Sequence, residues 1–233
     1  VVGHSVGELA ALHVAGVIDL DTGLTIALHR GRAMQRATGT GAMASVALTE
    51  EEAGRRLGLR AGGQSGDLSI AAINGPRSVV LSGATAAMDG ALATLESAGT
   101  SVRRLPVNYA FHSGLMEPFA AELERVLGPV TSRAPSMAVY STVTGARLAS
   151  AVHDSMPVDA AYFGRNVRQT VRFADAVAAM LDDGFDVFLE ISAHPVLGAA
   201  VAECAAARGA AALPLASLRR GRAARETFLQ STA

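Results

Sequence analysis

The sequence predicts an α/β fold in which a parallel-sheet core is interrupted by a small inserted subdomain. Three observations lead to this prediction. Predicted strands and helices alternate over most of the chain, which is typical of a parallel sheet covered by helices. Residues 42–107 instead follow the order strand, helix, strand, strand, helix, strand of a ferredoxin-like unit. The chain has 233 residues, which is enough for one domain with an additional small lobe.

The first predicted element is a strand that ends in a sharp turn. Residues 3–7 have the sequence Gly-His-Ser-Val-Gly, between an apolar pair and a run typical of a helix. This G-x-S-x-G pattern predicts a nucleophile elbow, which presents a serine in an α/β-hydrolase-like core. Taken alone, the pattern is explained equally well by an ordinary Gly-Ser turn. We also expect further residues of the sheet and site to precede Val1.

An elbow of this kind gives each of its residues a physical task. We expect Gly3 and Gly7 to be required because a Cβ atom at either position would crowd the turn. Ser5 would lie near a helix N-terminus, where free N–H groups and the helix dipole stabilise developing negative charge. The backbone N–H of Val6 is the natural first donor of an oxyanion hole.

Two helices are predicted between the turn and the inserted unit. The first covers residues 6–14. The second begins at an N-cap provided by Asp21 or Thr22, whose side chains can accept a hydrogen bond from the first turn, and it extends to Ala37. The turn at 39–41, which contains two glycines, ends this helix, and the pattern of the inserted unit follows.

The inserted unit has its own succession of elements. Thr49 is predicted to cap a short helix with an acidic first turn. The other predicted elements are strands at 42–48, 68–73, 78–82 and 101–107, a loop at 62–66 and a helix at 85–98. We assign residues 42–108 to this small subdomain and residues 1–41 and 109–233 to the large one.

After the inserted unit, the alternation of strands and helices resumes. A polar and aromatic junction at 108–113 precedes it. Helices are predicted at 117–127, 160–167, 173–181 and 195–207, strands at 138–142 and 186–191, and a loop at 150–157. We expect the strand at 186–191, an apolar run, to be buried within the parallel sheet.

The composition restricts the classes of function. Hydrophobic residues make up 50% of the chain and the net charge is −1, so no broad attraction to nucleic acid or to a membrane surface is expected. The single cysteine, Cys204, fits a reducing compartment and predicts a cytoplasmic location. All 20 basic residues are arginine, a bias that suggests a GC-rich bacterial genome. No spacing typical of a metal site is present, and no dinucleotide-binding fingerprint.

Two other residues are candidates for chemistry beside Ser5. His112 lies in the junction after the inserted unit, and Arg30 lies in the second predicted helix. Taken singly, each has a simpler explanation, as a loop histidine without a role and as a solvated helix arginine. His194 is an alternative base, because it follows a late strand, where α/β-hydrolases place their catalytic histidine.

Several separated segments match one protein family in order and spacing. Gly-His-Ser-Val-Gly-Glu matches its nucleophile motif, and Arg30 follows Ser5 by twenty-five residues, where the family keeps a carboxylate-binding arginine. The other matching segments are Tyr-Ala-Phe-His-Ser at 109–113, Tyr-Phe-Gly-Arg-Asn-Val-Arg at 162–168, Val-Arg-Phe at 171–173 and Leu-Glu-Ile-Ser-Ala-His-Pro-Val-Leu at 189–197. Over essentially its whole length, the chain resembles the acyltransferase domain of type I polyketide synthases, itself similar to malonyl-CoA:acyl carrier protein transacylase.

The resemblance implies acyl transfer through a covalent ester on Ser5, with His112 as general base and acid. It implies that Arg30 holds the free carboxylate of a malonyl group by two charge-assisted hydrogen bonds. In the family, a backbone carbonyl at the position matching Asn166 orients the histidine. The second oxyanion donor of the family comes from a glutamine-containing loop that lies before the position of Val1.

The resemblance also implies substrates and partners. The domain binds no cofactor of its own, its acyl donor is malonyl-CoA, and its acceptor is the phosphopantetheine thiol of an acyl carrier protein. Ketosynthase and other synthase domains are the expected neighbours. Three alternatives stay open: a malonyl transacylase of fatty acid synthesis, a serine esterase or thioesterase, and a non-catalytic module of a multienzyme.

Four residues near the motifs bear on the choice of acyl group. In the family, a phenylalanine at the position of Phe111 usually accompanies malonyl, because its ring fills the space beside the α-carbon, and Val6 favours the same group. Tyr109 belongs to the methylmalonyl pattern. His4 is expected to pack beside the nucleophile, with a contact to substrate and a purely structural role as equal alternatives. We expect malonyl, with a methylmalonyl-selective domain as the alternative.

Overall fold

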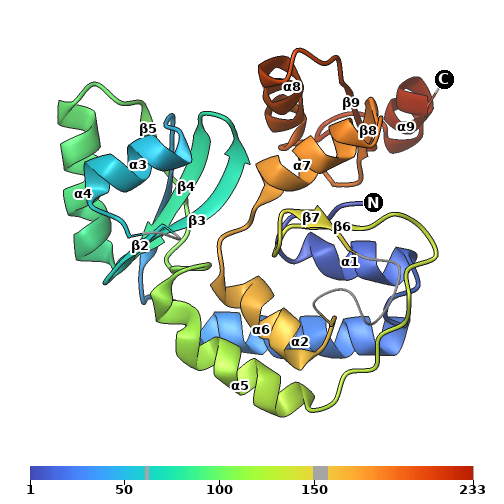
Figure 1. Ribbon diagram of the computed structural model, residues 1–233, viewed down its shortest axis with the longest axis horizontal. Coiled ribbons are helices and arrows are strands. Elements are labelled where there is room, and N and C mark those ends of the chain that lie inside the picture. Colours follow the sequence, from blue (N-terminus) through green and yellow to red (C-terminus); the bar gives the residue numbers. More distant parts are fainter. Residues whose placement is uncertain (61–62, 149–156, 233) are drawn as a thin grey trace.

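The computed structural model describes residues 1–60, 63–148 and 157–232. Its helices are α1 (Gly7–Val14), α2 (Leu20–Arg36), α3 (Glu50–Leu57), α4 (Thr85–Ser97), the short η1 (Gly114–Met116), α5 (Glu117–Leu127), α6 (Ala160–Arg168), α7 (Phe173–Asp182), α8 (Gly198–Ala207) and α9 (Ala224–Thr232). Its strands are β1 (Ala42–Val46), β2 (Gln64–Ser65), β3 (Leu68–Gly75), β4 (Ser78–Gly83), β5 (Val102–Arg104), β6 (Tyr140–Ser141), β7 (Ala146–Arg147), β8 (Val187–Glu190) and β9 (Leu213–Ala216). Figure 1 shows their arrangement.

The segment between β1 and β5 forms a five-stranded antiparallel sheet with α3 and α4 on one side (Figure 1). The strand order is β2-β3-β4-β1-β5, so that β1 lies between β4 and β5 and is antiparallel to both. The succession β1, α3, β3, β4, α4, β5 is the one predicted for the inserted unit. The loop predicted at 62–66 was wrong in part, because residues 64–65 form the short strand β2 along β3.

Both faces of this sheet are buried, because successive residues point into two different hydrophobic clusters. Ala44 and Leu81 join a cluster with residues of α3 and α4, whereas Met43 and Val80 join one with residues of α7 and α8. A register shift at residues 70–72 of β3 places two consecutive alanines in the second cluster. The sheet is therefore enclosed between helices that are close to it in sequence and helices that follow much later.

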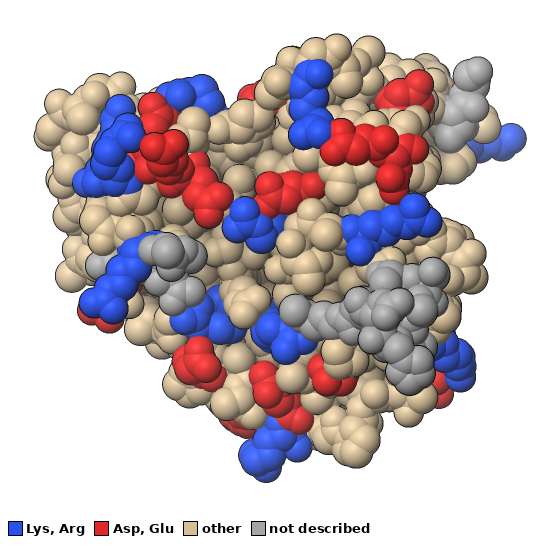
Figure 2. All heavy atoms as spheres, viewed as in Figure 1, with Lys and Arg blue, Asp and Glu red and all other residues tan. Residues whose placement is uncertain are grey.

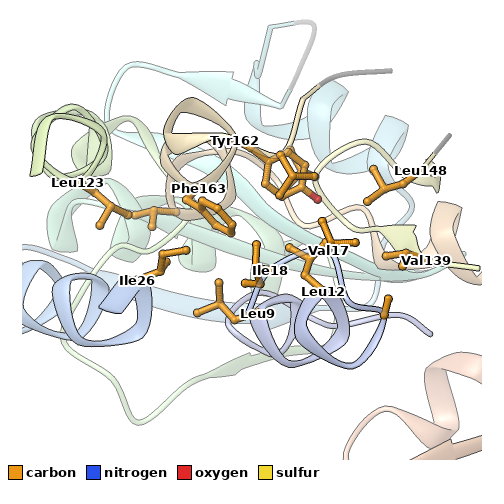
Figure 3. Close-up of a cluster of buried hydrophobic side chains, with 14 of the residues drawn as sticks. Leu9, Leu12, Val17, Ile18, Ile26, Leu123, Val139, Leu148, Tyr162 and Phe163 are labelled. Atoms are coloured by element: carbon orange, nitrogen blue, oxygen red, sulfur yellow. The ribbon is translucent and has the colours of Figure 1, made fainter. Parts of the chain in front are cut away.

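Helices α1, α2, α5 and α6 pack around another apolar cluster, shown in Figure 3. Leu12 of α1, Ile26 of α2, Leu123 of α5 and Phe163 of α6 meet there, and each is at most 2% exposed. Burial of a side chain of this size contributes about 1.5–3 kcal/mol. The cluster fixes these helices against one another. This positions the predicted site, because α1 begins just after Ser5, α2 contains Arg30 and α6 contains Asn166.

Parallel pairing is less extensive than predicted. In the described ranges, it consists of β8 with β9 and of two single bridges, Val2 with Tyr140 and Ala72 with Val171. The sequence pattern anticipated neither β9 nor α9. The loop predicted at 150–157 falls almost entirely outside the described residues.

Two local expectations were wrong. The strand predicted at 186–191 is not buried, and Val187 is 53% exposed. The reason is that α7 and α8 cover only one face of β8. The N-cap of α2 is Asp19 rather than Asp21 or Thr22. The helix begins at residue 20, and the Asp19 carboxylate accepts a hydrogen bond from the N–H of Thr22 at 2.8 Å.

The surface has charges of both signs. Figure 2 shows arginine side chains beside acidic ones over the visible face, with neither sign dominating. Some of them form ion pairs, such as Arg36 with Glu122 at 2.5 Å. This visible face therefore offers no single-sign patch for a polyanion. None of the described helices combines the length and the apolar character needed to cross a membrane.

Candidate active site

Two residues with unusual backbone geometry mark the site. Ser5 and His112 have φ angles of 53° and 58°, and they are the only non-glycine residues with positive φ in the described ranges. Left-handed backbone of this kind costs about 1–3 kcal/mol and persists where the surrounding structure fixes it, most often at functional sites. The predicted nucleophile and base therefore both occupy strained positions, although 107 residues separate them.

The turn around Ser5 depends on one of its two glycines. A Cβ atom on Gly3 would lie 2.3 Å from backbone atoms of Gly7 and Glu8, so the turn closes only with glycine there. The expectation for Gly7 was wrong, because a Cβ atom there would point into open space at the start of α1 and meet nothing within 4 Å. The elbow therefore needs only its first glycine for a steric reason.

The Ser5 hydroxyl and the His112 imidazole are hydrogen-bonded. Ser5 Oγ lies 2.8 Å from His112 Nε2. On the other side of the ring, Nδ1 lies 2.9 Å from the carbonyl oxygen of Gln169, which can only accept a hydrogen bond. Nδ1 therefore holds the proton, and Nε2 is left to accept the O–H of Ser5. This is the tautomer that a general base requires.

The carbonyl that faces His112 belongs to Gln169, and the expectation of Asn166 was wrong. Asn166 lies within α6, where carbonyl groups point along the helix axis, and its side-chain amide is what reaches the site. Gln169 follows the helix as its C-cap with extended backbone, at a ψ angle of 162°. Its carbonyl can therefore turn out of the helix toward the imidazole.

The surroundings keep the His112 imidazole neutral. His112 is 6% exposed. Burial and the positive charge of Arg30 lower the pKa of His112 to about 3, and the hydrogen bond to the Gln169 carbonyl offsets only part of this change. A neutral imidazole at pH 7 is able to take a proton from Ser5.

Arg30 reaches the same serine from α2. Its Nη2 donates to Ser5 Oγ at 2.8 Å, and its Nη1 donates to the side-chain oxygen of Asn166. Burial lowers the pKa of Arg30 to about 10, while the charge of Glu8 raises it, so the guanidinium is a cation at pH 7. Its Nε is buried and has no partner among the described residues. A buried cation with a free donor is suited to bind a planar anion such as a carboxylate.

Among the described residues, the backbone of the elbow leaves the N–H of Val6 free to donate. The N–H groups of Gly7 and Glu8 donate to the carbonyls of His4 and Ser5 at 3.0 and 3.1 Å. The N–H of Val6 makes no such bond within the described parts of the chain. It is therefore available to an oxyanion that forms beside Ser5.

The other predicted site residues with rings, Tyr109, Phe111 and His4, lie in the segments that contain Ser5 and His112. Tyr109 and Phe111 are stacked, with ring centroids 3.9 Å apart and planes inclined by 24°. The imidazole of His4 lies 2.8 Å, through its Nε2, from the side-chain oxygen of Asn74 and 5.6 Å from the ring of Phe173. These contacts join the elbow to β3 and α7, and they support the structural role expected of His4 as one of two alternatives.

Sequence reasoning missed two residues that contact the site, Gln169 and Glu8. Gln169 was missed, although its place just past a predicted helix was a signal that its carbonyl could turn aside. Glu8 was left without chemistry, although it lies three residues after Ser5, in the first turn of α1. The alternative base His194 accepts a hydrogen bond from the backbone N–H of Arg220 at 3.4 Å, whereas the imidazole at Ser5 is that of His112. No group of three or more metal-binding side chains is present among the described residues.

Comparison with known proteins gives consistent matches. Residues 1–233 match the acyl transferase domain family. The chain is 43% identical over 233 residues to polyketide synthase GfsB of Streptomyces halstedii, which covers 100% of the chain and 4% of the synthase. The acyltransferase domain from the second module of the salinomycin polyketide synthase matches with a TM-score of 0.87 and 40% identity over 100% of this chain and 52% of that one. A malonyl CoA-acyl carrier protein transacylase from Clostridium perfringens matches with a TM-score of 0.83 and 25% identity, over 99% and 70%.

The extent of these matches decides the assignment. The chain spans a small part of the synthase it resembles and about half of the solved salinomycin domain. The family match nevertheless extends over every residue of the chain, including the segments that bring the serine, the histidine and the arginine together. We conclude that this chain belongs to the acyl transferase domain family, whose members include domains of polyketide synthases.

Proposed function

We propose that this domain transfers a malonyl-type acyl group from CoA to Ser5 and then to the phosphopantetheine thiol of an acyl carrier protein. The observation that supports this most strongly is that His112 Nε2 and Arg30 Nη2 each lie 2.8 Å from Ser5 Oγ. A nucleophile, a base and a carboxylate-binding cation at one point fit an acyl group with a free carboxylate. The name of the similar Clostridium perfringens transacylase supports the same substrate class.

In the first half-reaction, Ser5 Oγ attacks the thioester carbonyl while its proton passes to Nε2 of His112. The N–H of Val6 donates to the carbonyl oxygen as that oxygen becomes negative. The tetrahedral intermediate then expels the CoA thiolate, the C–S bond breaks, and the imidazolium returns its proton to the sulfur. The malonyl group stays on Ser5 as an ester.

In the second half-reaction, His112 takes the proton of the phosphopantetheine thiol, and the thiolate attacks the ester carbonyl. The C–O bond to Ser5 breaks, and the imidazolium protonates the serine oxygen. Both halves use the domain's own residues, so it needs no bound cofactor. The acyl carrier protein is the proposed partner, and the multidomain relatives support ketosynthase and other synthase domains as neighbours.

Arg30 selects acyl groups that have a free carboxylate. In the absence of substrate, its Nη2 is bonded to Ser5 Oγ, and its Nε has no partner among the described residues. A carboxylate beside the thioester satisfies this buried donor, whereas an acetyl group leaves it unsatisfied. The guanidinium therefore favours malonyl-type groups over simple acyl groups.

The aromatic pair beside His112 favours malonyl over methylmalonyl. Phe111 is stacked on Tyr109 and packs against two hydrophobic clusters, so its ring has little room to move away from an added methyl group. A pocket discriminates between two substrates that differ by one methyl group by only about 1–3 kcal/mol of transition-state binding. A methylmalonyl-selective domain is therefore the alternative. Tyr109 is the residue that supports this alternative.

The domain organisation is part of the proposal. Residues 1–41 and 109–233 form an α/β-hydrolase-like subdomain, and residues 42–108 form a ferredoxin-like one. The strand order β3-β4-β1-β5 and the helices α3 and α4 support the second assignment. The single cysteine supports a cytoplasmic location.

The test is the intact mass of the protein after incubation with mixed malonyl-, methylmalonyl- and acetyl-CoA. We expect one malonyl adduct, which is absent in Ser5→Ala and passes to a carrier-protein thiol faster than to water. Loss of the acyl group mainly to water would indicate an esterase or thioesterase, and no adduct would indicate a non-catalytic module. Faster loading of methylmalonyl than of malonyl would contradict the proposed selectivity.

A further inference from the structure

A buried carboxylate lies directly behind the nucleophile, and the proposed reaction does not use it. Glu8 of α1 is 1% exposed. Its oxygens accept hydrogen bonds from the Thr142 hydroxyl at 2.7 Å, from the Asn166 side-chain nitrogen at 3.1 Å and from the Tyr162 hydroxyl. All three donors are neutral. Burial raises the pKa of Glu8, and the hydrogen bonds from Tyr162 and Thr142 oppose this change. The ionised carboxylate accepts from all three donors, but they leave its charge unbalanced.

A buried cation, Arg30, connects to Glu8 through one amide. The side-chain nitrogen of Asn166 donates to Glu8, and also to the carbonyl of Ser5 at 3.3 Å. The oxygen of the same amide accepts from Nη1 of Arg30. Asn166 therefore lies between the buried anion and the buried cation, with each end of the amide facing the group it can bond.

This arrangement balances the positive charge of Arg30 without using all the hydrogen-bond donors of its guanidinium. Arg30 is 4% exposed, and the charge of Glu8 raises its pKa against the effect of burial. A direct ion pair would use two guanidinium donors, whereas the intervening Asn166 uses one. The Nη2 donor stays on Ser5 Oγ, and Nε stays without a partner among the described residues. The cation is thus stabilised by a second charge while it keeps donors for a ligand.

A ligand carboxylate at Arg30 is then a second anion near the same cation. Two negative charges around one buried guanidinium repel each other, and this repulsion is strong where water is excluded. Glu8 therefore weakens the binding of a carboxylate that Arg30 attracts. A site of this kind is able to release an acyl group that it first has to recognise.

We infer that Glu8 is the counter-charge of Arg30 and that, through Asn166, it sets how tightly the site holds the free carboxylate of an acyl group. Glu8 does not touch the reacting atoms, so it is a positioning residue that acts through Arg30. The inference rests on the proposed function only in naming the acyl group.

The test removes the charge of Glu8 without changing its size. In Glu8→Gln, the ratio of kcat/KM for malonyl-CoA to that for acetyl-CoA should rise about tenfold, and free malonate should bind about tenfold more tightly. A general folding defect lowers both kcat/KM values and does not raise their ratio. Glu122→Gln is the matched control, because Glu122 pairs at the surface with Arg36, which lies on α2 like Arg30. Its ratio should stay within about twofold of the wild type.

Two further variants make the result decisive. In an Arg30→Ala background, Glu8→Gln should leave the ratio unchanged, because the residue through which it acts is gone. Tyr162→Phe removes one hydrogen-bond donor to Glu8 and thereby destabilises its ionised form. The ratio of kcat/KM for malonyl-CoA to that for acetyl-CoA should then rise by about twofold. This milder variant gives the answer if Glu8→Gln does not fold.

Specific outcomes would overturn the inference. A ratio that is unchanged or lower in both Glu8→Gln and Tyr162→Phe contradicts it, and so does an equal rise in the Arg30→Ala background. Malonate binding separates this failure from that of the proposed function. If the wild type forms no malonyl adduct, the proposed function is wrong, but malonate should still bind more tightly to Glu8→Gln than to the wild type.

Discussion

The five-stranded sheet and the site around Ser5 are stabilised in different ways. In the sheet, β1 and β4 pair in unbroken register, and apolar side chains cover both faces. At the site, Ser5 and His112 have strained backbone, and the charged side chains of Arg30 and Glu8 are buried. The sheet depends on many small and similar contributions, whereas the site depends on a few groups that nothing nearby replaces. Substitutions should therefore separate stability from activity between these two regions.

The largest expected effect is the removal of the imidazole. His112→Ala should slow the loading of Ser5 from malonyl-CoA by about 10²–10⁴-fold, because His112 is the only described residue placed to accept the serine proton. The measurement is the rate of adduct formation by rapid quench and intact mass. His13→Ala, at an exposed position of α1, is the control and should load at the wild-type rate. Loading by His112→Ala at the wild-type rate would mean that the site works without this base.

Removal of the guanidinium should affect one class of acyl group. Arg30→Ala should cost about 2–5 kcal/mol in kcat/KM for malonyl-CoA and far less for acetyl-CoA. The control is Arg36→Ala on the same helix, where the arginine pairs with Glu122 at the surface. Steady-state kinetics with both thioesters measure the difference. An equal loss for both would indicate that Arg30 supports the fold or the serine rather than the carboxylate.

The parts of the molecule that the sequence predicted well are those specified locally. The helix that Thr49 caps and the strands on either side of the turn at 74–77 depend on neighbours in the chain, and their patterns were sufficient. Ser5, His112 and Arg30 were identified because they belong to family motifs with fixed spacing. The structure brings them together as those motifs imply.

The parts that the sequence did not predict depend on tertiary contacts. Gln169 holds the imidazole because α6 ends before it and the chain then pairs at Val171 with β3. The end of the predicted helix was a local signal, but no local pattern indicates the pairing with β3. Glu8 meets Tyr162 and Asn166 only when α6 packs beside α1, and no local pattern indicates this packing. The exposure of Val187 was missed because an apolar run has the same appearance whether one face or both faces of a strand are covered.

Substitution of the two glycines of the elbow by alanine should change the free energy of unfolding by smaller amounts and in opposite directions. Gly3→Ala should lower the free energy of unfolding by at least about 1–3 kcal/mol, because its Cβ would overlap the backbone of Gly7 and Glu8. Gly7→Ala should raise it by about 0.5–1 kcal/mol, because alanine favours the helix and meets open space. Urea unfolding of both variants measures the difference. Destabilisation of the same size at both positions would show that the elbow is crowded on both sides.

In the sheet-containing part, a comparable change should leave activity intact. Thr49 and Glu52 form a capping box at the start of α3, with both hydrogen bonds at 3.0 Å. Thr49→Ala should therefore cost about 1 kcal/mol of stability. The loading rate of Ser5 per folded molecule should be unchanged, because α3 lies on the opposite face of the sheet from α7 and α8. A slower loading rate would show that this helix and the site are coupled.

The smallest expected effect is that of pH on loading, and its sign follows from the environment of His112. Burial and the charge of Arg30 lower the pKa of His112 from 6.5 to about 3, so folding favours the neutral imidazole. The resulting contribution to stability is complete above pH 6.5 and is lost as the pH falls toward 3. Between pH 7 and pH 5 the folded protein therefore keeps its base, and the loading rate should change by less than about twofold. Rates measured on protein shown to be folded at each pH test this directly. A decline centred near pH 6.5 would mean that the imidazole titrates as it does in water, and that neither its burial nor the arginine beside it prepares the site for proton transfer.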